Sequence, residues 1–347
     1  MDAGPARRRL ALGARLGAGG ARRTRGAGGG RLLEGPGTAA PERAAGPHAS
    51  RGPAVTDQGR PRRVLLPVGG VEDHHAGVAF AAQEAVRRGC DIDVLHVAHP
   101  AGREDGSGVL DMAETVVERT VEAARRSLGR ARPAVRGRLA RGDVVPALVE
   151  DSRQVALVVL TRRHARGAVV LSTMTVANAL GAHAHAPVAV VPPRWSPGTT
   201  TAPILVGIGG RHAESRHVLR AGLEQARRCG ARAELVHGWW YSDAYDDLVL
   251  SGPTGRAETA RRRARLAAEL APVLADFRDI DVRLRVEHGR PARLLLEATE
   301  RAQLVVLGRH QPLLPFGSEL GPLTRAVISG AACPALIVGS PAPAAGP

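Results

Sequence analysis

Residues 135–163 read VRGRLARGDVVPALVEDSRQVALVVLTRR, and residues 282–310 read VRLRVEHGRPARLLLEATERAQLVVLGRH. At a constant offset of 147 positions and without gaps, 11 of these 29 positions are identical, and both segments contain the same Leu-Val-Val-Leu run near their end. An ungapped internal match of this length indicates that the chain contains a duplicated domain.

The match extends outward from this segment in both directions. Residues 64–70 read VLLPVGG and residues 204–210 read ILVGIGG, while apolar runs that follow Pro187 and Pro334 lie again 147 positions apart. Two homologous domains and a preceding tail follow from this pattern. Their predicted bounds are residues 1–58 for the tail, 59–196 for the first domain and 197–343 for the second.

Short aliphatic runs alternate with longer amphipathic stretches within each predicted domain. Residues 157–160 are apolar on both faces of a strand, which is typical of a parallel sheet covered by helices on both sides. Residues 115–128 place apolar side chains at helical spacing, with Glu and Arg between them. We therefore predict tandem α/β domains, each with a doubly wound, parallel five-stranded sheet. The strands expected in the first domain are residues 63–68, 92–98, 134–139, 155–160 and 187–192.

The positive charge of the chain is concentrated in its tail. All 48 basic residues are Arg and the net charge is +15, with ten Arg against three acidic residues in positions 1–54. This tail has no aromatic residue and several glycine runs, so it cannot bury a core and we expect it to be disordered. Nucleic-acid binding through its arginines is the alternative, although no aromatic side chain is present for base stacking.

The tail also raises a question about translation. Val55 leads directly into the first predicted strand, and a valine codon can serve as a bacterial start. We hypothesise that residues 1–54 are not translated, and an intact mass equal to that of the full chain would contradict this.

Cysteine content and hydropathy bear on the compartment. Cys90, Cys229 and Cys333 are too few and too widely spaced for a disulfide scaffold or a paired zinc site. Charged or polar residues interrupt every apolar run well before the roughly 18 residues of a membrane span. We therefore expect a cytoplasmic protein with no metal site and no membrane contact.

The second domain ends in the most specific pattern of the sequence. An apolar strand is followed by a glycine-containing loop, a helix that begins Thr324-Arg-Ala-Val, an Ala-Cys-Pro turn at residues 332–334, and a last apolar strand. Over residues 62–340 the chain resembles the universal stress protein A family in its tandem form. The resemblance implies an adenine nucleotide alpha hydrolase-like fold.

ATP-binding members of that family carry the loop motif G-x2-G-x9-G-[S/T] after strand four, and an Asp at the end of strand one. The motif positions of the second domain are Gly308, Gln311, Gly321 and Pro322. Those of the first domain are Thr161, His164, Met174 and Thr175. The Asp is replaced in both domains, by Gly69 and Gly209. Neither domain carries the complete set.

These departures weaken a phosphate site for physical reasons. Glycines let the backbone approach a phosphate at positive φ, which Gln311 tolerates poorly, and Pro322 has neither a hydroxyl nor an amide hydrogen to donate. Arg162, Arg309 and His310 lie beside the loops and could meet an anion instead. The candidate nucleotide-binding residues are Gly308, Arg309, Gly321, Gly209 and Thr175.

Other patterns give weaker signals. His74-His75 and His183-Ala-His185 lack a third ligand at zinc-like spacing, so we interpret them as helix starts or helix surfaces. Ser172 and Thr173 lack the G-x-S-x-G elbow, and we predict no catalytic residue. Residues 239–241 read WWY just after a strand, where they fit a core or domain contact and a ligand or partner surface equally well.

Three functions are compatible with these observations. The missing glycines and carboxylates favour a non-enzymatic stress-response or regulatory module with degenerate nucleotide sites and no cofactor. An ATP-binding or slowly ATP-hydrolysing switch that uses Gly308 and Gly321 is the first alternative. The second is nucleic-acid binding through the Arg-rich tail, which predicts salt-sensitive binding that is lost when residues 1–54 are deleted.

The family resemblance also implies that the two domains pair through their last strands, here residues 188–191 and 335–338. Edge strands this apolar need covering, and pairing them within one chain would give a two-fold-like pseudodimer. A proline at Val190 or Leu336 should then destabilise the pair. We expect protein partners, or self-association through these strands, rather than nucleic acid.

Overall fold

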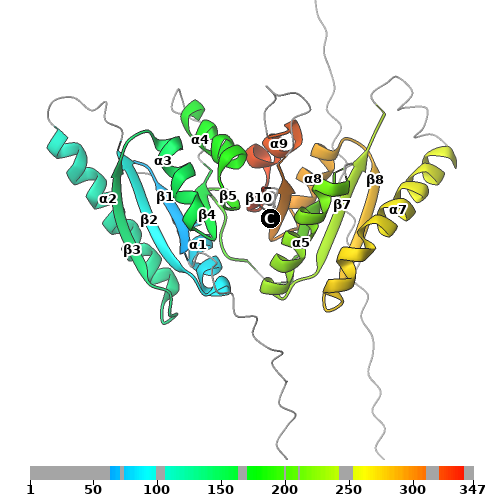
Figure 1. Ribbon diagram of the computed structural model, residues 1–347, viewed down its shortest axis with the longest axis horizontal. Coiled ribbons are helices and arrows are strands. Elements are labelled where there is room, and N and C mark those ends of the chain that lie inside the picture. Colours follow the sequence, from blue (N-terminus) through cyan, green and yellow to red (C-terminus); the bar gives the residue numbers. More distant parts are fainter. Residues whose placement is uncertain are drawn as a thin grey trace, which may run out of the picture. The chain divides into compact units, whose positions relative to one another are not determined.

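The computed structural model describes residues 63–70, 74–98, 106–162, 170–198, 201–209, 212–241, 253–309 and 320–339 (Figure 1). The expectations about the tail, residues 1–58, therefore lie outside the described residues. Two repeats make up the described chain, and we call them repeat 1 and repeat 2.

Repeat 1 alternates strands and helices from its first residue to its last. In chain order its elements are β1 (Arg63–Val68), α1 (His75–Arg88), β2 (Asp91–Ala98), α2 (Gly106–Leu128), β3 (Val135–Arg141), α3 (Val144–Asp151), a 3₁₀ turn (Ser152–Gln154), β4 (Leu157–Thr161), α4 (Val170–His183) and β5 (Val188–Val191). The predicted strands agree with these bounds to within two residues, and α2 begins nine residues before the predicted helix.

Repeat 2 follows the same order. Its elements are β6 (Ile204–Gly207), α5 (His212–Cys229), β7 (Ala233–Trp239), α7 (Pro253–Leu274), a 3₁₀ turn (Ala275–Phe277), β8 (Val282–His288), α8 (Pro291–Thr299), β9 (Leu304–Gly308), α9 (Pro322–Gly330) and β10 (Ala335–Val338).

The described strands form one ten-stranded sheet in the order β3-β2-β1-β4-β5-β10-β9-β6-β7-β8. Every neighbouring pair is parallel except β5 and β10, which pair antiparallel with Ala189 opposite Leu336 (Figure 1). Each repeat thus has the same strand order, and the short apolar strands β5 and β10 cover each other's edge. The tandem α/β prediction is confirmed.

Helices cover both faces of this sheet. Val64 and Leu66 of β1 point into a core shared with α1, α2, α5 and α7, whereas the intervening Leu65 points into a core shared with α3, α4, α8 and α9. Both faces of a central strand are therefore buried, which explains why these strands read as continuous apolar runs. Among the described helices, none is both long and apolar enough to cross a lipid bilayer.

One glycine position of the internal match, occupied by Gly142 and Gly289, is explained by its backbone conformation. Gly142 and Gly289 follow β3 and β8 with φ of 139° and 144°, a region that residues with a side chain rarely adopt. Each turns the chain from an outer strand into the helix that leads toward the centre of the sheet.

Candidate functional site

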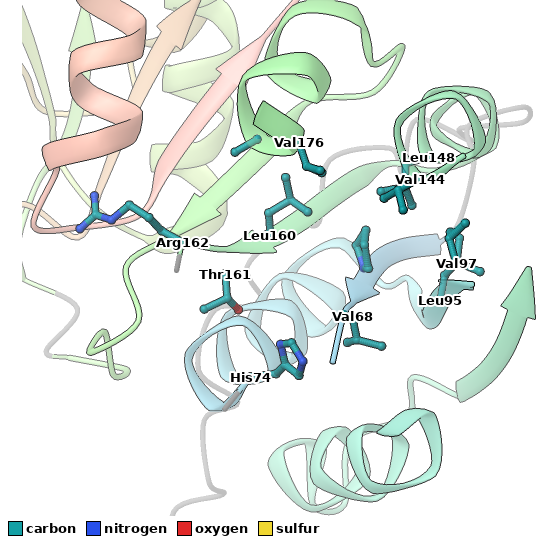
Figure 2. Close-up of a pocket in the computed structure, with 13 residues that line it drawn as sticks. Val68, His74, Leu95, Val97, Val144, Leu148, Leu160, Thr161, Arg162 and Val176 are labelled. Atoms are coloured by element: carbon teal, nitrogen blue, oxygen red, sulfur yellow. The ribbon is translucent and has the colours of Figure 1, made fainter. Parts of the chain in front are cut away.

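Repeat 1 has a cavity of about 200 Å³ at the carboxyl ends of β1, β2 and β4 (Figure 2). Ligands of doubly wound sheets bind at this end of the strands. Helices α3 and α4 cover the cavity from one face of the sheet. The residues that line it are Pro67, Val68, Gly69, His74, Leu95, Val97, Val144, Leu148, Leu160, Thr161, Arg162, Val176 and Ala177.

The cation on this lining is engaged elsewhere. The Arg162 side chain points away from the cavity and toward α9 of repeat 2 (Figure 2), where its Nη1 donates to the carbonyl oxygen of Ile328 at 3.3 Å. Burial lowers the pKa of Arg162 from its ordinary value. The Arg162 guanidinium, which by its place in the sequence could have met an anion, donates instead to backbone near the end of a helix.

Arg309 occupies the same position in repeat 2 and makes the reciprocal contact. Its Nε donates to the carbonyl oxygen of Gly181 at 2.6 Å, and its Nη2 donates to that of Ala184. Both acceptors lie at the carboxyl end of α4, where helix carbonyls lack partners within the helix and attract cations. Arg162 and Arg309 therefore each cap a helix of the other repeat, and we call them the crossed arginines.

Gly308 is required by packing at the end of β9. A Cβ added there would lie 2.6 Å from Cγ2 of Val218 on α5. In repeat 1 the sizes are exchanged: Thr161 stands in the place of Gly308, and Gly77 of α1 stands in the place of Val218. An added Cβ at Gly77 would overlap Oγ1 of Thr161. The contact between strand and helix thus accounts for Gly308 without a ligand.

The other three predicted residues come from three different elements. Gly321 precedes α9 with φ of −62° and ψ of 160°, an ordinary extended conformation that needs no glycine. Gly209 is exposed beyond β6, and an added Cβ there would have no neighbour within 4 Å. Thr175 lies within α4, but its side chain lies outside the described part of the chain, as do His164, His310 and Gln311.

Gly209 instead borders a second cavity, of about 360 Å³, on the α7 side of repeat 2. Two ion pairs lie on its lining: Nε of Arg262 is 2.7 Å from Oε1 of Glu258, and Nε of Arg265 is 2.9 Å from Oε1 of Glu269. Opposite charges on one helix thus largely compensate each other here. The residues that line this cavity are Gly209, His237, Glu258, Arg261, Arg262, Arg265, Leu266 and Glu269.

By their sequence, the aromatic residues 239–241 fit either a core contact or a surface for a ligand or partner, and the structure places them in both environments. Trp239 is buried in the core, with the guanidinium of Arg262 4.7 Å from its ring centroid. Trp240 and Tyr241 are exposed by 47% and 38%. The first residue therefore supports the core, and the next two lie at the surface.

On the α8 side of repeat 2, protein atoms lie close against the two equivalent strand positions, which are both glycine. An added Cβ at Gly207 would overlap Cδ2 of Leu307 and lie 3.3 Å from Leu295. At Gly238 it would lie 2.9 Å from Cα of Pro291. The corresponding residues of repeat 1 are Pro67 and Val97, whose side chains line the cavity.

Two histidines at these strand ends were missed by the sequence interpretation. His96 Nδ1 lies 3.0 Å from the carbonyl oxygen of Val68, and His237 Nδ1 lies 2.9 Å from that of Ile208. Each imidazole ties the end of one strand to its neighbour. The recurrence of a histidine in LHVA and VHGW, residues 95–98 and 236–239, was the signal that could have identified them. Within the described ranges, no group of three His, Cys, Asp or Glu side chains could hold a metal ion.

The fold and the site can now be compared with known proteins. The model of the universal stress protein family matches residues 61–192 and 201–339, and so covers most of the chain. The chain belongs to the universal stress protein family. Its tandem organisation is shared with relatives over almost their entire length, since a universal stress protein of Mycobacterium tuberculosis is 30% identical over 303 residues, which are 80% of this chain and 95% of the relative.

Other universal stress proteins give the same result. One from Mycolicibacterium smegmatis is 29% identical over 290 residues, which are 79% of this chain and 96% of the relative. A crystal structure of a universal stress protein from Archaeoglobus fulgidus covers 81% of this chain and 97% of its own with a TM-score of 0.59, at 16% identity. That likeness shows the fold alone.

In this tandem universal stress protein the two repeats also meet through buried polar groups on α1 and α5. Nε2 of Gln225 donates to Glu84 at 2.8 Å, and Arg88 donates both to Glu84 at 2.8 Å and to Gln225 at 2.9 Å. Arg87 adds a bond to Glu84 at 3.1 Å. Glu84 and Gln225 are each 1% exposed and occupy equivalent positions in the two repeats. We call this group the α1/α5 cluster.

Proposed function

We propose that this tandem universal stress protein is a non-enzymatic stress-response module, in which neither repeat holds the phosphates of ATP. The observation that carries the proposal is the placement of the crossed arginines. Arg162 and Arg309 are the described arginines that directly follow β4 and β9, beside the two degenerate motifs, and both donate to helix carbonyls of the opposite repeat. To bind a phosphate they would have to leave buried backbone acceptors without a donor, which costs free energy.

The backbone around the motif supports the same conclusion. Gly308 is explained by its contact with Val218, and Pro322, at the first turn of α9, has no amide hydrogen to offer. Gly69 and Gly209 provide no carboxylate at the ends of β1 and β6. Among the described residues, the two crossed arginines are thus committed to contacts between the repeats, the strand-one carboxylates are replaced by glycine, and the hydroxyl position of repeat 2 is Pro322. Such a module acts through protein partners.

The proposal is tested by titrating the full-length chain with ATP in a calorimeter, with and without magnesium. A polyphosphate of similar charge is the control, because a chain of net charge +15 attracts any polyanion. We expect ATP to bind no more tightly than polyphosphate, with no release of inorganic phosphate above background.

A matched pair of variants makes the test specific for the motif. Gly321→Ala leaves the extended conformation at this position accessible, and Gly209→Ala meets no neighbouring atom within 4 Å. We expect neither variant to change the ATP signal. Magnesium-dependent, saturable ATP binding that weakens in Gly321→Ala would overturn the proposal and favour a nucleotide-controlled switch.

A further inference from the structure

The cavity of repeat 1 has mainly aliphatic walls. Most of its lining consists of aliphatic side chains from β1, β2, α3, β4 and α4. Leu95 and Leu148 are at most 1% exposed, so the inner wall belongs to the buried core of the repeat. The aliphatic residues of the wall are Val68, Leu95, Val97, Val144, Leu148, Leu160, Val176 and Ala177.

Charge compensation for an anionic ligand is poor on this lining. Arg162 is the one Arg among the described lining residues, and its guanidinium lies 3.3 Å from the carbonyl of Ile328, pointing away from the space (Figure 2). Moving a phosphate or carboxylate out of water without a paired cation is strongly unfavourable. An uncharged molecule meets no such penalty and gains from covering the aliphatic wall.

Polar groups gather at one side of the space. Thr161 at the end of β4 and His74 at the start of α1 both line it, and Figure 2 shows the Thr161 hydroxyl on the side toward His74. A pocket with apolar walls and a few polar groups that fix orientation is the usual form of a small-molecule site. Thr161 and His74 could orient a hydroxyl-like group of a ligand at this side of the cavity.

We propose that the cavity of repeat 1 binds a small uncharged molecule with an apolar body of about six to ten non-hydrogen atoms and at most one hydroxyl-like group. The size follows from the volume of about 200 Å³, since a dry apolar cavity of about 150 Å³ already binds benzene. The inference rests on the proposed function, because a site that still bound ATP phosphates would be differently charged.

Repeat 2 provides an internal comparison for this assignment. Leu307 lies against Gly207, and Pro291 lies against Gly238, so protein atoms of repeat 2 take the places that the Pro67 and Val97 side chains hold in repeat 1. The helix α8 and Leu307 therefore approach these two strand positions too closely for the side chains that repeat 1 has there. In repeat 1, Pro67 and Val97 lie on the wall of the cavity. Any ligand of the proposed class should thus distinguish the two repeats.

The first experiment titrates the full-length chain with benzyl alcohol and with n-hexanol, followed by calorimetry and by thermal unfolding. We expect saturable binding with one site per chain and a negative heat-capacity change, which is the signature of apolar burial. Val176→Phe places an aromatic ring on the cavity wall and should weaken binding at least tenfold. Leu323→Phe makes the matching change at the equivalent position of α9 and should leave binding within twofold.

A second pair of variants keeps the test decisive if Val176→Phe fails to fold. Leu148→Ala enlarges the cavity, so binding of a larger probe, 2-phenylethanol, should tighten several-fold relative to benzyl alcohol. Leu295→Ala removes the equivalent leucine in repeat 2 and should not change that ratio. Unsaturable binding in the unchanged chain, or equal binding in all variants, would overturn the inference.

An ATP titration on the same samples separates the two conclusions. Binding of neither ATP nor benzyl alcohol overturns the inference and leaves the proposed function standing. Magnesium-dependent ATP binding that displaces benzyl alcohol overturns both, because the cavity would then be part of a nucleotide site. Binding of benzyl alcohol that is unaffected by ATP and lost in Val176→Phe supports both.

Discussion

The two repeats share a strand order and a pair of crossed arginines, yet they differ at the strand ends where ligands bind in such sheets. Repeat 2 retains Gly308 of the loop motif, and Leu307 lies against Gly207 on its α8 side, whereas repeat 1 lacks that glycine and has an aliphatic cavity on its α3 side. The cavity of repeat 2 lies on the α7 side, is lined mostly by charged residues of that helix, and does not include Gly308. A retained motif glycine is therefore poor evidence for a retained pocket, because Gly308 is already required by its contact with Val218.

The largest effect is expected where the repeats meet in the α1/α5 cluster. Glu84→Gln removes a buried carboxylate that accepts from Arg87, Arg88 and Gln225, and it leaves these arginines uncompensated. We expect a loss of about 3 kcal/mol in the free energy of unfolding, measured by urea denaturation. The exchange variant Glu84→Gln/Gln225→Glu moves the carboxylate to the equivalent position and should recover at least half of the loss. No recovery would show that the two positions are not interchangeable.

The second-largest effect is expected on the α8 side of repeat 2, where Gly238 lies against Pro291. Gly238→Ala places a Cβ 2.9 Å from the Cα of Pro291, so α8 must move away from the sheet. We expect a loss of about 2 kcal/mol, because backbone cannot rotate away as a side chain can. The control is Gly209→Ala, which has no neighbour within 4 Å and should lie within about 0.5 kcal/mol of the unchanged chain. Equal stability of both variants would contradict the close contact between Gly238 and α8.

The crossed arginines should differ in strength between the repeats. Arg309 donates to two carbonyls, at 2.6 Å to Gly181 and also to Ala184, while Arg162 has one bond of 3.3 Å. We expect Arg309→Gln to cost about 2 kcal/mol and Arg162→Gln about 1 kcal/mol in unfolding free energy. Chemical denaturation of the two variants side by side provides the measurement. The opposite order would mean that the longer contact is the more important one.

The smallest effect is expected at the end of β9, where Gly308 lies against Val218. Gly308→Ala should cost about 1 kcal/mol, because its Cβ would lie 2.6 Å from Cγ2 of Val218 and that side chain has to move aside. Val218→Ala in the same chain should remove most of that penalty, which a double-mutant cycle measures as a coupling energy. Additive effects of the two substitutions would instead leave Gly308 without a packing explanation.

Much of the fold could be predicted because its evidence is local and repeated. The Leu-Val-Val-Leu runs at residues 157–160 and 304–307 identified the central strands, and the constant offset of 147 identified the duplication. Gly142 and Gly289 recur because a turn with positive φ requires them. The α/β architecture of both repeats followed from such patterns, since strand and helix periodicity are properties of a short stretch of chain.

The candidate site could not be predicted in the same way. Arg162 and Arg309 stand beside the degenerate motifs in the sequence, and only the packing of the two repeats directs their guanidinium groups to carbonyls more than a hundred residues away. The predicted nucleotide-binding residues are consequently spread over a strand end, a helix start and a helix interior. Side-chain direction depends on the neighbouring repeat, and the motif alone does not include that neighbour.

The amino-acid sequence by itself determined that the chain holds two parallel α/β repeats, because periodicity and duplication are properties of the chain itself. The family followed from the resemblance of its motifs and from the match of the family model. Only the tertiary structure decided that the aliphatic cavity lies in repeat 1, on its α3 side. Pro67 and Val97 line a cavity in repeat 1, whereas the equivalent Gly207 and Gly238 have close neighbours in repeat 2. This difference depends on how closely α3 or α8 approaches the sheet. That distance is set by side chains from several elements at once, which no single stretch of sequence contains.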